Sequence, residues 1–293
     1  MRNKPLSRVY RTLNHEIHYM MSFIGGCLEI VSFMYLYKAL IGYMTSNMIF
    51  GIAALANGGM DFESVYHISI ILIWMVLAAL HQLLVNRYHS RLHSPWHGYA
   101  IAMSINCLLL LAFMLLGAAM SRYGLLGAKP TPLVMPLVTI GLIFMYIQNF
   151  VIKHGGTRQP TATSVVTTVY VLMMSRLFSV FDRQRNRRER LRLYHEGLHY
   201  LMVIAHFFVG ALVTALLSRH IGFYSLSLAL LALLLFTLRI WVVHGRHRAA
   251  LIRLDAVKTA AAGCRWDLRA PQRSVGEGRL ALLMAISALR IRR

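Results

Sequence analysis

The sequence predicts an all-α protein, a polytopic membrane helical bundle of six full spans and two short helical segments. Of its 293 residues, 57% are hydrophobic and only 14% are charged, whereas charged residues make up about a quarter of an average soluble protein. The formal net charge is +21, and most Lys and Arg residues flank the apolar runs, which is typical of segments retained on the cytoplasmic side. Composition and charge distribution therefore predict a multi-pass membrane protein whose two termini are both cytoplasmic.

The spans and their basic flanks divide the chain into three parts. Residues 1–18 are predicted to be a basic cytoplasmic N-terminus, residues 19–245 the transmembrane domain, and residues 246–293 a basic cytoplasmic tail. The six full spans are expected at Tyr19–Gly42, His67–Val85, Tyr99–Met120, Leu133–Ile152, Tyr200–Ser218 and Gly222–Val243. In the tail, residues 278–293 form either a short basic amphipathic helix on the anionic leaflet or a disordered segment.

The first span carries a carboxyl group, Glu29, near its middle. A charged carboxyl in hydrocarbon costs about 3 kcal/mol on insertion scales, so this side chain must be protonated, paired or in contact with a watery cavity. We therefore take Glu29 as the central candidate for a functional site. The alternative is a neutral side chain whose hydrogen bonds only hold neighbouring helices together.

Residues 43–59 form the first short segment. They are apolar but fewer than the about 20 residues that a crossing requires, and they open on Thr45, Ser46 and Asn47. The acidic connection after them contains no Lys or Arg, so we expect it to be external. The segment is a candidate half-helix.

Residues 160–180 form the second short segment, which opens on a cluster containing Thr163, Thr167 and Thr168. Six arginines follow between positions 183 and 192. A full crossing would place these arginines outside, so the positive-inside rule favours a segment that enters from the cytoplasm and returns to it. Irregular backbone at that depth requires protein or a watery cavity around it.

The chain also shows a duplicated plan. Residues 19–120 contain a span with a polar centre, a short segment and two full spans; residues 133–243 repeat this order, with Gln148 and Asn149 late in the first span. If both short segments re-enter, the copies are inverted and one half-helix enters from each side, as in secondary transporters. If both cross, there are eight crossings and parallel copies. The inverted arrangement is preferred because it keeps Lys and Arg inside more consistently.

This plan predicts a polar site near the membrane midplane. Its candidate residues are Glu29, Thr45, Ser46, Asn47, Gln148, Asn149, Thr163, Thr167 and Thr168. Hydroxyls and amides suit a neutral or anionic small solute, so we expect a secondary transporter or permease of unknown substrate, with Glu29 as the residue that would couple transport to protons. The alternative is a non-catalytic membrane scaffold or sensor in which the same residues only hold helices together.

The strongest enzyme-like motif is His195-Glu196-Gly197-Leu198-His199, which matches the HExxH pattern of zinc metalloproteases. It lies at the membrane edge, Gly197 interrupts it, and no later apolar run contains an acidic third ligand, although catalytic zinc ordinarily has three protein ligands. A related motif, His15-Glu16-Ile17-His18-Tyr19, opens the first span, which favours an interfacial anchoring role for both. We therefore expect no metal, no cofactor and no enzymatic activity, with an intramembrane zinc protease as the weakest alternative.

The remaining features are consistent with a membrane protein. The three cysteines have unrelated spacings and two lie in apolar runs, so we expect small core residues rather than disulfides. Pro95 breaks the helical face that His89, His93 and His97 would otherwise share. No nucleic-acid recognition motif accompanies the positive charge, so the expected partners are the lipid bilayer and its anionic headgroups.

Four stretches agree in order and spacing with one family pattern. They are Gly26-Cys27-Leu28-Glu29-Ile30, Met44-Thr45-Ser46-Asn47, Gln148-Asn149 and Thr163-Ser164-Val165-Val166-Thr167-Thr168-Val169. Over about residues 17–245 the chain resembles the YoaK family of uncharacterised bacterial inner-membrane proteins, which implies a polytopic protein of the bacterial inner membrane and gives no substrate. The family pattern has Asp at position 29, Gly at position 46 and Gly-Thr at positions 168–169. Loss of a glycine removes an easy route to positive φ, so the site of this chain is expected to differ.

Overall fold

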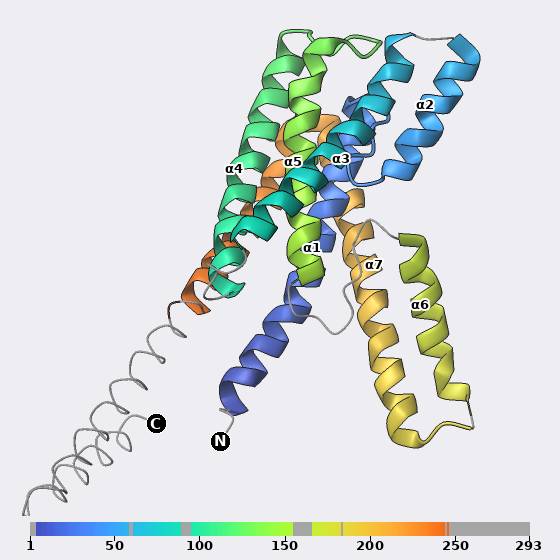
Figure 1. Ribbon diagram of the computed structural model, residues 1–293, viewed down its shortest axis with the longest axis vertical. Helices are drawn as coiled ribbons and strands as arrows, with labels where there is room; N and C mark the ends of the chain where they lie inside the picture. Colours follow the sequence, from blue (N-terminus) through green and yellow to red (C-terminus); the bar gives the residue numbers. More distant parts are fainter. Residues whose placement is uncertain are drawn as a thin grey trace, which may run out of the picture. The chain divides into compact units, whose positions relative to one another are not determined.

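The structure is a computed structural model that describes residues 4–58, 61–88, 95–154, 166–182, 184–243 and 245. Throughout this part the chain is helical and contains no strand, which confirms the predicted all-α class (Figure 1). The α-helices are α1 (Lys4–Tyr35), α2 (Met44–Gly58), α3 (Phe62–Tyr88), α4 (Pro95–Arg122), α5 (Met135–His154), α6 (Val166–Phe178) and α7 (Arg187–Ile221), followed by a helix at residues 227–243. Short 3-10 helices are η2 (Pro132–Val134), η3 (Ser179–Phe181) and η4 (Gly222–Leu226). The predicted tail 246–293, with Cys264, and the predicted histidine cluster at positions 89–97 lie outside the residues described in full.

The helices are those of a membrane protein. In the described part of the chain, five stretches are long and apolar enough to cross a bilayer: Glu16–Tyr35, Phe62–Leu83, Gly98–Arg122, Pro132–Ile152 and Arg187–Val243. Large apolar side chains lie on their outer faces; Leu83, Leu108 and Leu238 are 66%, 68% and 61% exposed. Contiguous exposed apolar surface of this kind requires an apolar environment, so these faces contact the lipid bilayer.

The last stretch, 57 residues long, contains two helices, α7 and residues 227–243. The chain leaves α7 at Gly222, whose φ of 57° lies in the left-handed region that glycine adopts readily. Near this point Tyr35, the last residue of α1, donates a hydrogen bond from its hydroxyl to the Ser218 carbonyl of α7. Arg239, in the helix after α7, pairs with Glu16 at the other end of the apolar stretch of α1. Residues 227–239 therefore run back antiparallel to α7, and the predicted fifth and sixth spans are separate helices.

Two predicted boundaries are wrong. The first span was expected to continue to Gly42, but α1 ends at Tyr35 because Tyr37 and Lys38 adopt left-handed φ values of 52° and 61°. The helix expected to start at Tyr200 starts already at Arg187. The Asn186 side chain caps it by accepting a hydrogen bond from the Glu189 amide at 2.9 Å. The arginines from Arg187 to Arg192 thus lie in the first turns of α7.

Helices α1 and α7 pack closely and run parallel. Ser22 bonds the Val203 carbonyl, Cys27 bonds the Gly210 carbonyl and Tyr35 bonds the Ser218 carbonyl, so residue numbers rise together along both helices. A methyl group at Gly26 would collide with the backbone carbonyl oxygen of Phe207, and one at Gly210 with that of Phe23. This reciprocal contact of two glycines brings the helix backbones together, as small residues do in membrane interfaces.

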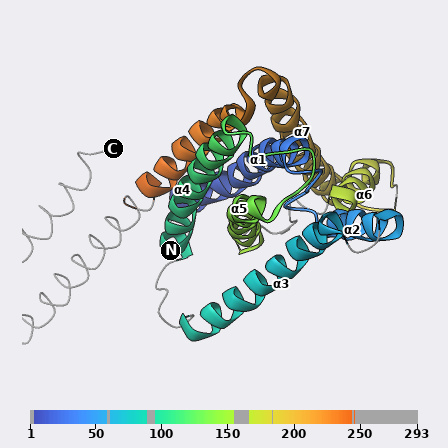
Figure 2. The same ribbon diagram turned by 90° about the horizontal axis from the view of Figure 1, so that it is seen from above.

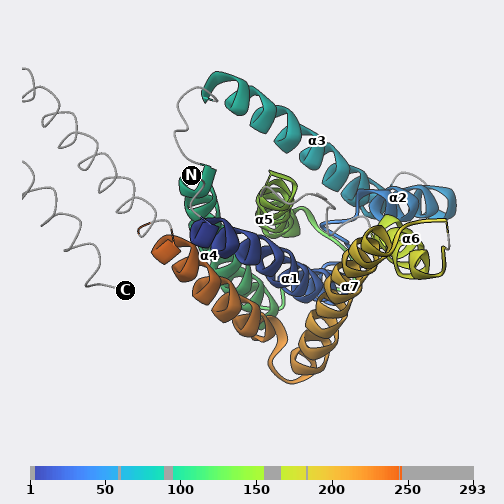
Figure 3. The ribbon, with the colours of Figure 1, turned by 90° about the horizontal axis from the view of Figure 1, so that it is seen from below.

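Helix α5 lies between α1, α3 and α4 (Figures 2 and 3). It runs antiparallel to α1, because Gln148 bonds the Met21 carbonyl while Gly141, seven residues earlier, packs against Ile41. On its other side the Tyr146 ring contacts Trp74 and His81 of α3, with a 2.9 Å hydrogen bond to His81.

The two short helices point to opposite ends of the bundle. Helix α2 forms a hairpin with α3, since Gly51 packs on Ser64 and Ile68. Trp74 contacts Tyr146 and His81 contacts Phe150, so α3 runs parallel to α5 and opposite to α1. Helix α2 is antiparallel to α3 in the hairpin and therefore runs in the direction of α1. Helix α6 forms a hairpin with α7, with Leu177 on Gly197 at its far end, so α6 runs opposite to α1. In Figure 1, α2 accordingly leads to the top and α6 to the bottom.

The two ends are named here by their residues. The arginine-rich end holds the start of α7 at Arg187 and the ion pair of Glu16 with Arg239, while the opposite end holds Ser218. Helices α1, α2 and α4 run in one direction and α3 runs in the other. In the second set, α5, α6 and the helix 227–243 run in the direction of α3, and α7 runs in the direction of α1, so each helix is reversed relative to its counterpart in the first set. These are the directions that an inverted duplication requires.

Candidate functional site

Glu29 faces an irregular link, residues 36–43, that joins α1 to α2. Its side chain is 3% exposed, and one carboxylate oxygen accepts a hydrogen bond from the Gly42 amide. Since Tyr35 lies six residues beyond Glu29, about 9 Å along the helix, the link turns back from the end of α1 into the bundle. Helix α2 therefore begins at the depth of Glu29, well inside the apolar stretch of α1.

Asn47 holds this link from the first turn of α2. Its amide donates to the Leu40 carbonyl at 2.6 Å and to the Tyr43 carbonyl at 3.2 Å, and its oxygen accepts from the Leu40 amide at 3.3 Å. The same oxygen lies 3.2 Å from Nδ1 of His67, and Tyr66 donates to the Leu36 carbonyl at 3.0 Å. Side chains thus satisfy irregular backbone inside the bundle, which is the condition for its presence at membrane depth.

The other predicted site residues are spread more widely. Thr45 is exposed and Ser46 half-buried at the start of α2. Gln148 is buried and donates to the Met21 carbonyl, two turns of α1 away from Glu29. Asn149 is half-buried, and neither of its amide atoms has a hydrogen-bond partner in the described part of the chain. Thr163 and the side chains of Thr167 and Thr168 lie outside the described residues.

The structure thus brings Glu29 and Asn47 together through the link, while Gln148 lies on the same side of α1 at a different depth. Both Glu29 and Gln148 keep one buried oxygen unbonded: Oε2 of Glu29 and Oε1 of Gln148 have no hydrogen-bond partner among the described residues. Most buried polar atoms of native proteins have a hydrogen-bond partner, so these two oxygens are the positions at which a proton or a polar group would bind.

A cavity of about 170 Å³ lies between α1, α6 and α7. It is lined by Ser22, Val169, Tyr170, Val203, Ile204, Phe207, Phe208 and Ala211. The lining is mostly apolar, with hydroxyls from Ser22 and Tyr170, and it includes none of the predicted site residues whose side chains are described. The aromatic ring of Phe207 packs edge-on against that of Tyr43, with ring centroids 6.4 Å apart. Tyr43 directly follows Gly42, whose amide donates to Glu29. Phe207 thus connects the wall of the cavity with the link that Glu29 binds.

Sequence reasoning did not select Ser22, Tyr43 or Phe207. These residues belong to apolar runs in which nothing distinguishes them. One weak signal exists: Phe23-x-x-Gly26 and Phe207-x-x-Gly210 share a pattern, and the structure places these two glycines in reciprocal contact.

The HExxH motif lies within α7, and its two histidines differ in their contacts. His199 bonds to α1 through His18 and Tyr19, whereas His195 is exposed and contacts the neighbouring Tyr194 ring. Among the described residues there is no group of three or more His, Cys, Asp or Glu side chains arranged to hold a metal. Cys27 and Cys107 are free and buried, as expected of core residues.

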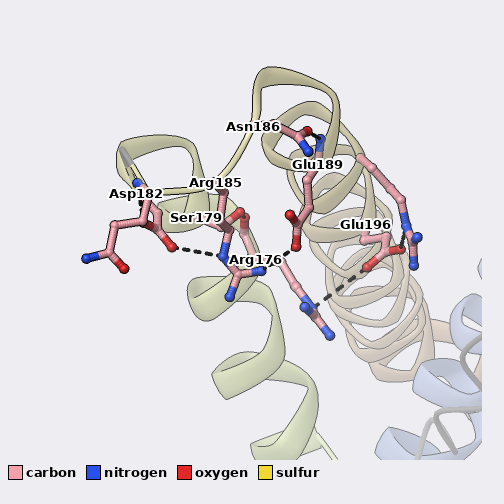
Figure 4. Close-up of polar contacts among 9 residues, drawn as sticks. Arg176, Ser179, Asp182, Arg185, Asn186, Glu189 and Glu196 are labelled. Atoms are coloured by element: carbon pink, nitrogen blue, oxygen red, sulfur yellow. Dashed lines mark hydrogen bonds and ion pairs between the residues drawn. The ribbon is translucent and has the colours of Figure 1, made fainter.

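Glu196, the acid of this motif, joins an ionic network that ties α6 to α7 (Figure 4). It pairs with Arg192 at 3.1 Å and with Arg176 of α6 at 3.8 Å. In the turn between the helices, Asp182 accepts from Arg185 at 2.8 Å, and this hydrogen bond holds the pKa of the Asp182 carboxyl below its usual range. These contacts fix the arginine-rich end of α6.

The comparison with protein families agrees with this description. A family model described as Protein of unknown function (DUF1275) matches residues 17–239. The chain belongs to this family. The DUF1275 match covers nearly the stretch, 17–245, over which the sequence resembles the YoaK proteins, and it includes both short helices. No curated protein and no solved structure matches the chain.

Proposed function

We propose that this DUF1275 protein is a secondary transporter or permease for a small solute, coupled to protons through Glu29. One observation carries the proposal: two short helices run to opposite ends of the bundle, and the irregular backbone before α2 is bonded to a buried carboxyl group. Val169 and Tyr170, near the start of α6, line the cavity together with Ser22 of α1. Discontinuous helices of opposite direction are a feature of midplane sites in secondary transporters.

The geometry supports a simple coupling mechanism. Oε1 of Glu29 accepts from the Gly42 amide, and Oε2 is the position at which a proton would bind. Protonation weakens the carboxyl as an acceptor, because hydrogen bonds to an ionised acceptor are roughly twice as strong as neutral ones. The link is then released, Tyr43 moves away from Phe207, and the cavity connects with Glu29. Gain or loss of one proton thus controls access to the cavity.

The bacterial inner membrane, cytoplasmic termini and YoaK membership belong to the same proposal. They are supported by the grouping of α7's arginines and Arg239 at one end, where anionic headgroups of the cytoplasmic leaflet would meet them.

A scaffold or sensor is the second candidate, and one specific observation favours it. Glu29 and Asn47 are both engaged by the link, and the described cavity lies beyond Tyr43 rather than beside the carboxyl group. In a scaffold these bonds would only stabilise the fold.

Replacing Glu29 with Gln distinguishes the two candidates. A metabolite panel is first screened at pH 6 and pH 8 for compounds that raise the unfolding temperature, since a ligand that binds only the folded protein stabilises it. Uptake of the best compound into proteoliposomes with an imposed pH gradient is then measured. Because Gln keeps an acceptor for Gly42 but cannot exchange a proton, we expect Glu29→Gln to fold and to lose pH-driven uptake at least tenfold.

Glu63→Gln is the matched control, since Glu63 is an exposed carboxyl in the first turn of α3; its uptake should equal that of the wild type. Unchanged uptake by Glu29→Gln would rule out proton coupling through this residue. A screen without any stabilising compound, together with a lowered unfolding temperature of Glu29→Gln, would favour the scaffold.

A further inference from the structure

The two related motifs of the sequence meet in the structure. His18 of the first motif and His199 of the second lie on the parallel helices α1 and α7. Nδ1 of His18 is 3.1 Å from Nε2 of His199, and the Tyr19 hydroxyl is 2.8 Å from Nδ1 of His199. Both nitrogens of one imidazole are therefore hydrogen-bonded, to a second imidazole on one side and to a phenol on the other.

A second layer supports these rings. Tyr19 stacks on His206, with ring centroids 5.1 Å apart and planes at 14°, and Nδ1 of His206 is 2.7 Å from the Met202 carbonyl. A carbonyl only accepts, so Nδ1 of His206 carries the hydrogen. The stack orients Tyr19 towards His199.

The hydrogen-bond pattern allows a proton to pass along the chain of groups. A neutral imidazole has one N–H, so His199 donates at one nitrogen and accepts at the other. When His18 gains a proton, its Nδ1–H can be transferred to Nε2 of His199, whose Nδ1–H passes to the Tyr19 oxygen as the hydroxyl releases its own proton to a water molecule. One proton enters, one leaves, and each group ends with the number it had.

Fixed charges near the three rings are already paired. On α1 Glu16 pairs with Arg239 of the last helix at 2.6 Å, and on α7 Glu196 pairs with Arg192 and with Arg176 of α6. The buried Tyr200 lies within the electrostatic range of Arg176 and Glu196. With these pairs formed, the imidazoles of His18, His199 and His206 are the groups of this region whose charge a proton would change.

The group lies one turn of α1 before a residue that lines the cavity. Ser22, one turn further along α1 from His18, lines the cavity, and its hydroxyl hydrogen is donated to the Val203 carbonyl, which leaves its oxygen as an acceptor. The cavity volume of about 170 Å³ would hold a few water molecules at about 30 Å³ each. Its wall at Phe207 contacts Tyr43, beside the link that Glu29 binds.

We propose that His18, His199 and Tyr19 form a proton relay that carries the coupling proton from the arginine-rich end to the cavity. The relay rests on the proposed function, because it supplies the proton that Glu29 uses. It also assigns a role to the second histidine of the HExxH motif that involves no metal.

The relay is tested with His199→Gln and its matched control His195→Gln, an exposed histidine of the same motif. In ¹⁵N-histidine NMR titrations of the full chain in detergent, the wild type should show His18 and His199 titrating together, and His199→Gln should leave His18 titrating as a single site. His195→Gln should leave the coupled titration unchanged. Independent titration of His18 and His199 in the wild type would overturn the relay.

Uptake measurements then separate the relay from the transport proposal. We expect His199→Gln and Tyr19→Phe each to reduce pH-driven uptake at least tenfold while solute-induced thermal stabilisation persists. Tyr19→Phe keeps the ring stack and removes only the hydroxyl, so its uptake tests the relay even if His199→Gln fails to fold. Normal uptake in Tyr19→Phe with loss of uptake in Glu29→Gln would overturn the relay alone. Absence of uptake in the wild type would overturn the transport proposal and, with it, the relay.

Discussion

Replacing Gly26 with Ala is expected to lower the unfolding temperature of the protein in detergent by about 10 °C. The added methyl group would meet the carbonyl oxygen of Phe207 and the backbone nitrogen of Ala211. Backbone atoms of a helix cannot turn away as a flexible side chain can, so α1 and α7 must separate. Overpacking of this kind costs about 3 kcal/mol, and in a protein of this size each kcal/mol shifts the unfolding temperature by about 2–4 °C.

The matched control is Gly127→Ala, since Gly127 is exposed and has no neighbouring atom within reach of a new methyl group. We expect its unfolding temperature to stay within about 1 °C of the wild type. Gly210→Ala should behave like Gly26→Ala because its methyl group would meet the Phe23 carbonyl. An unfolding temperature of Gly26→Ala equal to that of the control would contradict the close parallel packing of α1 and α7.

Replacing Asn47 with Ala should be nearly as damaging, for a different reason. The side chain donates to two carbonyls and accepts from one amide of the buried link. Its loss leaves the Leu40 amide and the Leu40 carbonyl without these partners inside the bundle, and each buried unsatisfied group costs about 1–3 kcal/mol. We expect a loss of about 3 kcal/mol in the free energy of unfolding, measured as a lower unfolding temperature and faster proteolysis at the link.

Asn57→Ala provides the comparison, because Asn57 lies on the same helix and is exposed. Its stability should change by less than about 0.5 kcal/mol. Equal stability of the two variants would show that the link is not held by Asn47 and would remove the basis for α2 starting inside the bundle.

Much of the fold could be predicted from the sequence because the bilayer imposes a simple rule: apolar runs of crossing length become helices. The short segments were also recognisable, since the polar residues Thr45, Ser46 and Asn47 cannot lie in lipid unsupported. The link itself was not predictable. Leu36, Ala39 and Ile41 are as apolar as the span before them, and only the left-handed turn at Tyr37 and Lys38 ends the helix.

The candidate site was predictable in part. A carboxyl group in an apolar run is easily recognised in the sequence as a candidate site residue, and the structure places Glu29 and Asn47 at the same link. The partners of these residues were not visible because they are backbone groups, such as the Gly42 amide, or apolar side chains such as Phe207. The contact of His18 with His199 joins positions 181 residues apart, and no local pattern specifies such a pairing. Four of the six arginines before the motif lie in the first turns of α7, although the predicted span began only at Tyr200.

The central claim is that the two short helices begin inside the bundle and run to opposite faces of the membrane. It is tested most directly by labelling single cysteines with a membrane-impermeant maleimide in sealed vesicles of one orientation, in a chain whose native cysteines are replaced. The positions are Asn57→Cys at the end of α2 and Phe181→Cys in η3 just beyond α6, both exposed. The account predicts labelling of the two cysteines from opposite faces, whereas labelling of both from the same face is the result of two crossing segments and would contradict it.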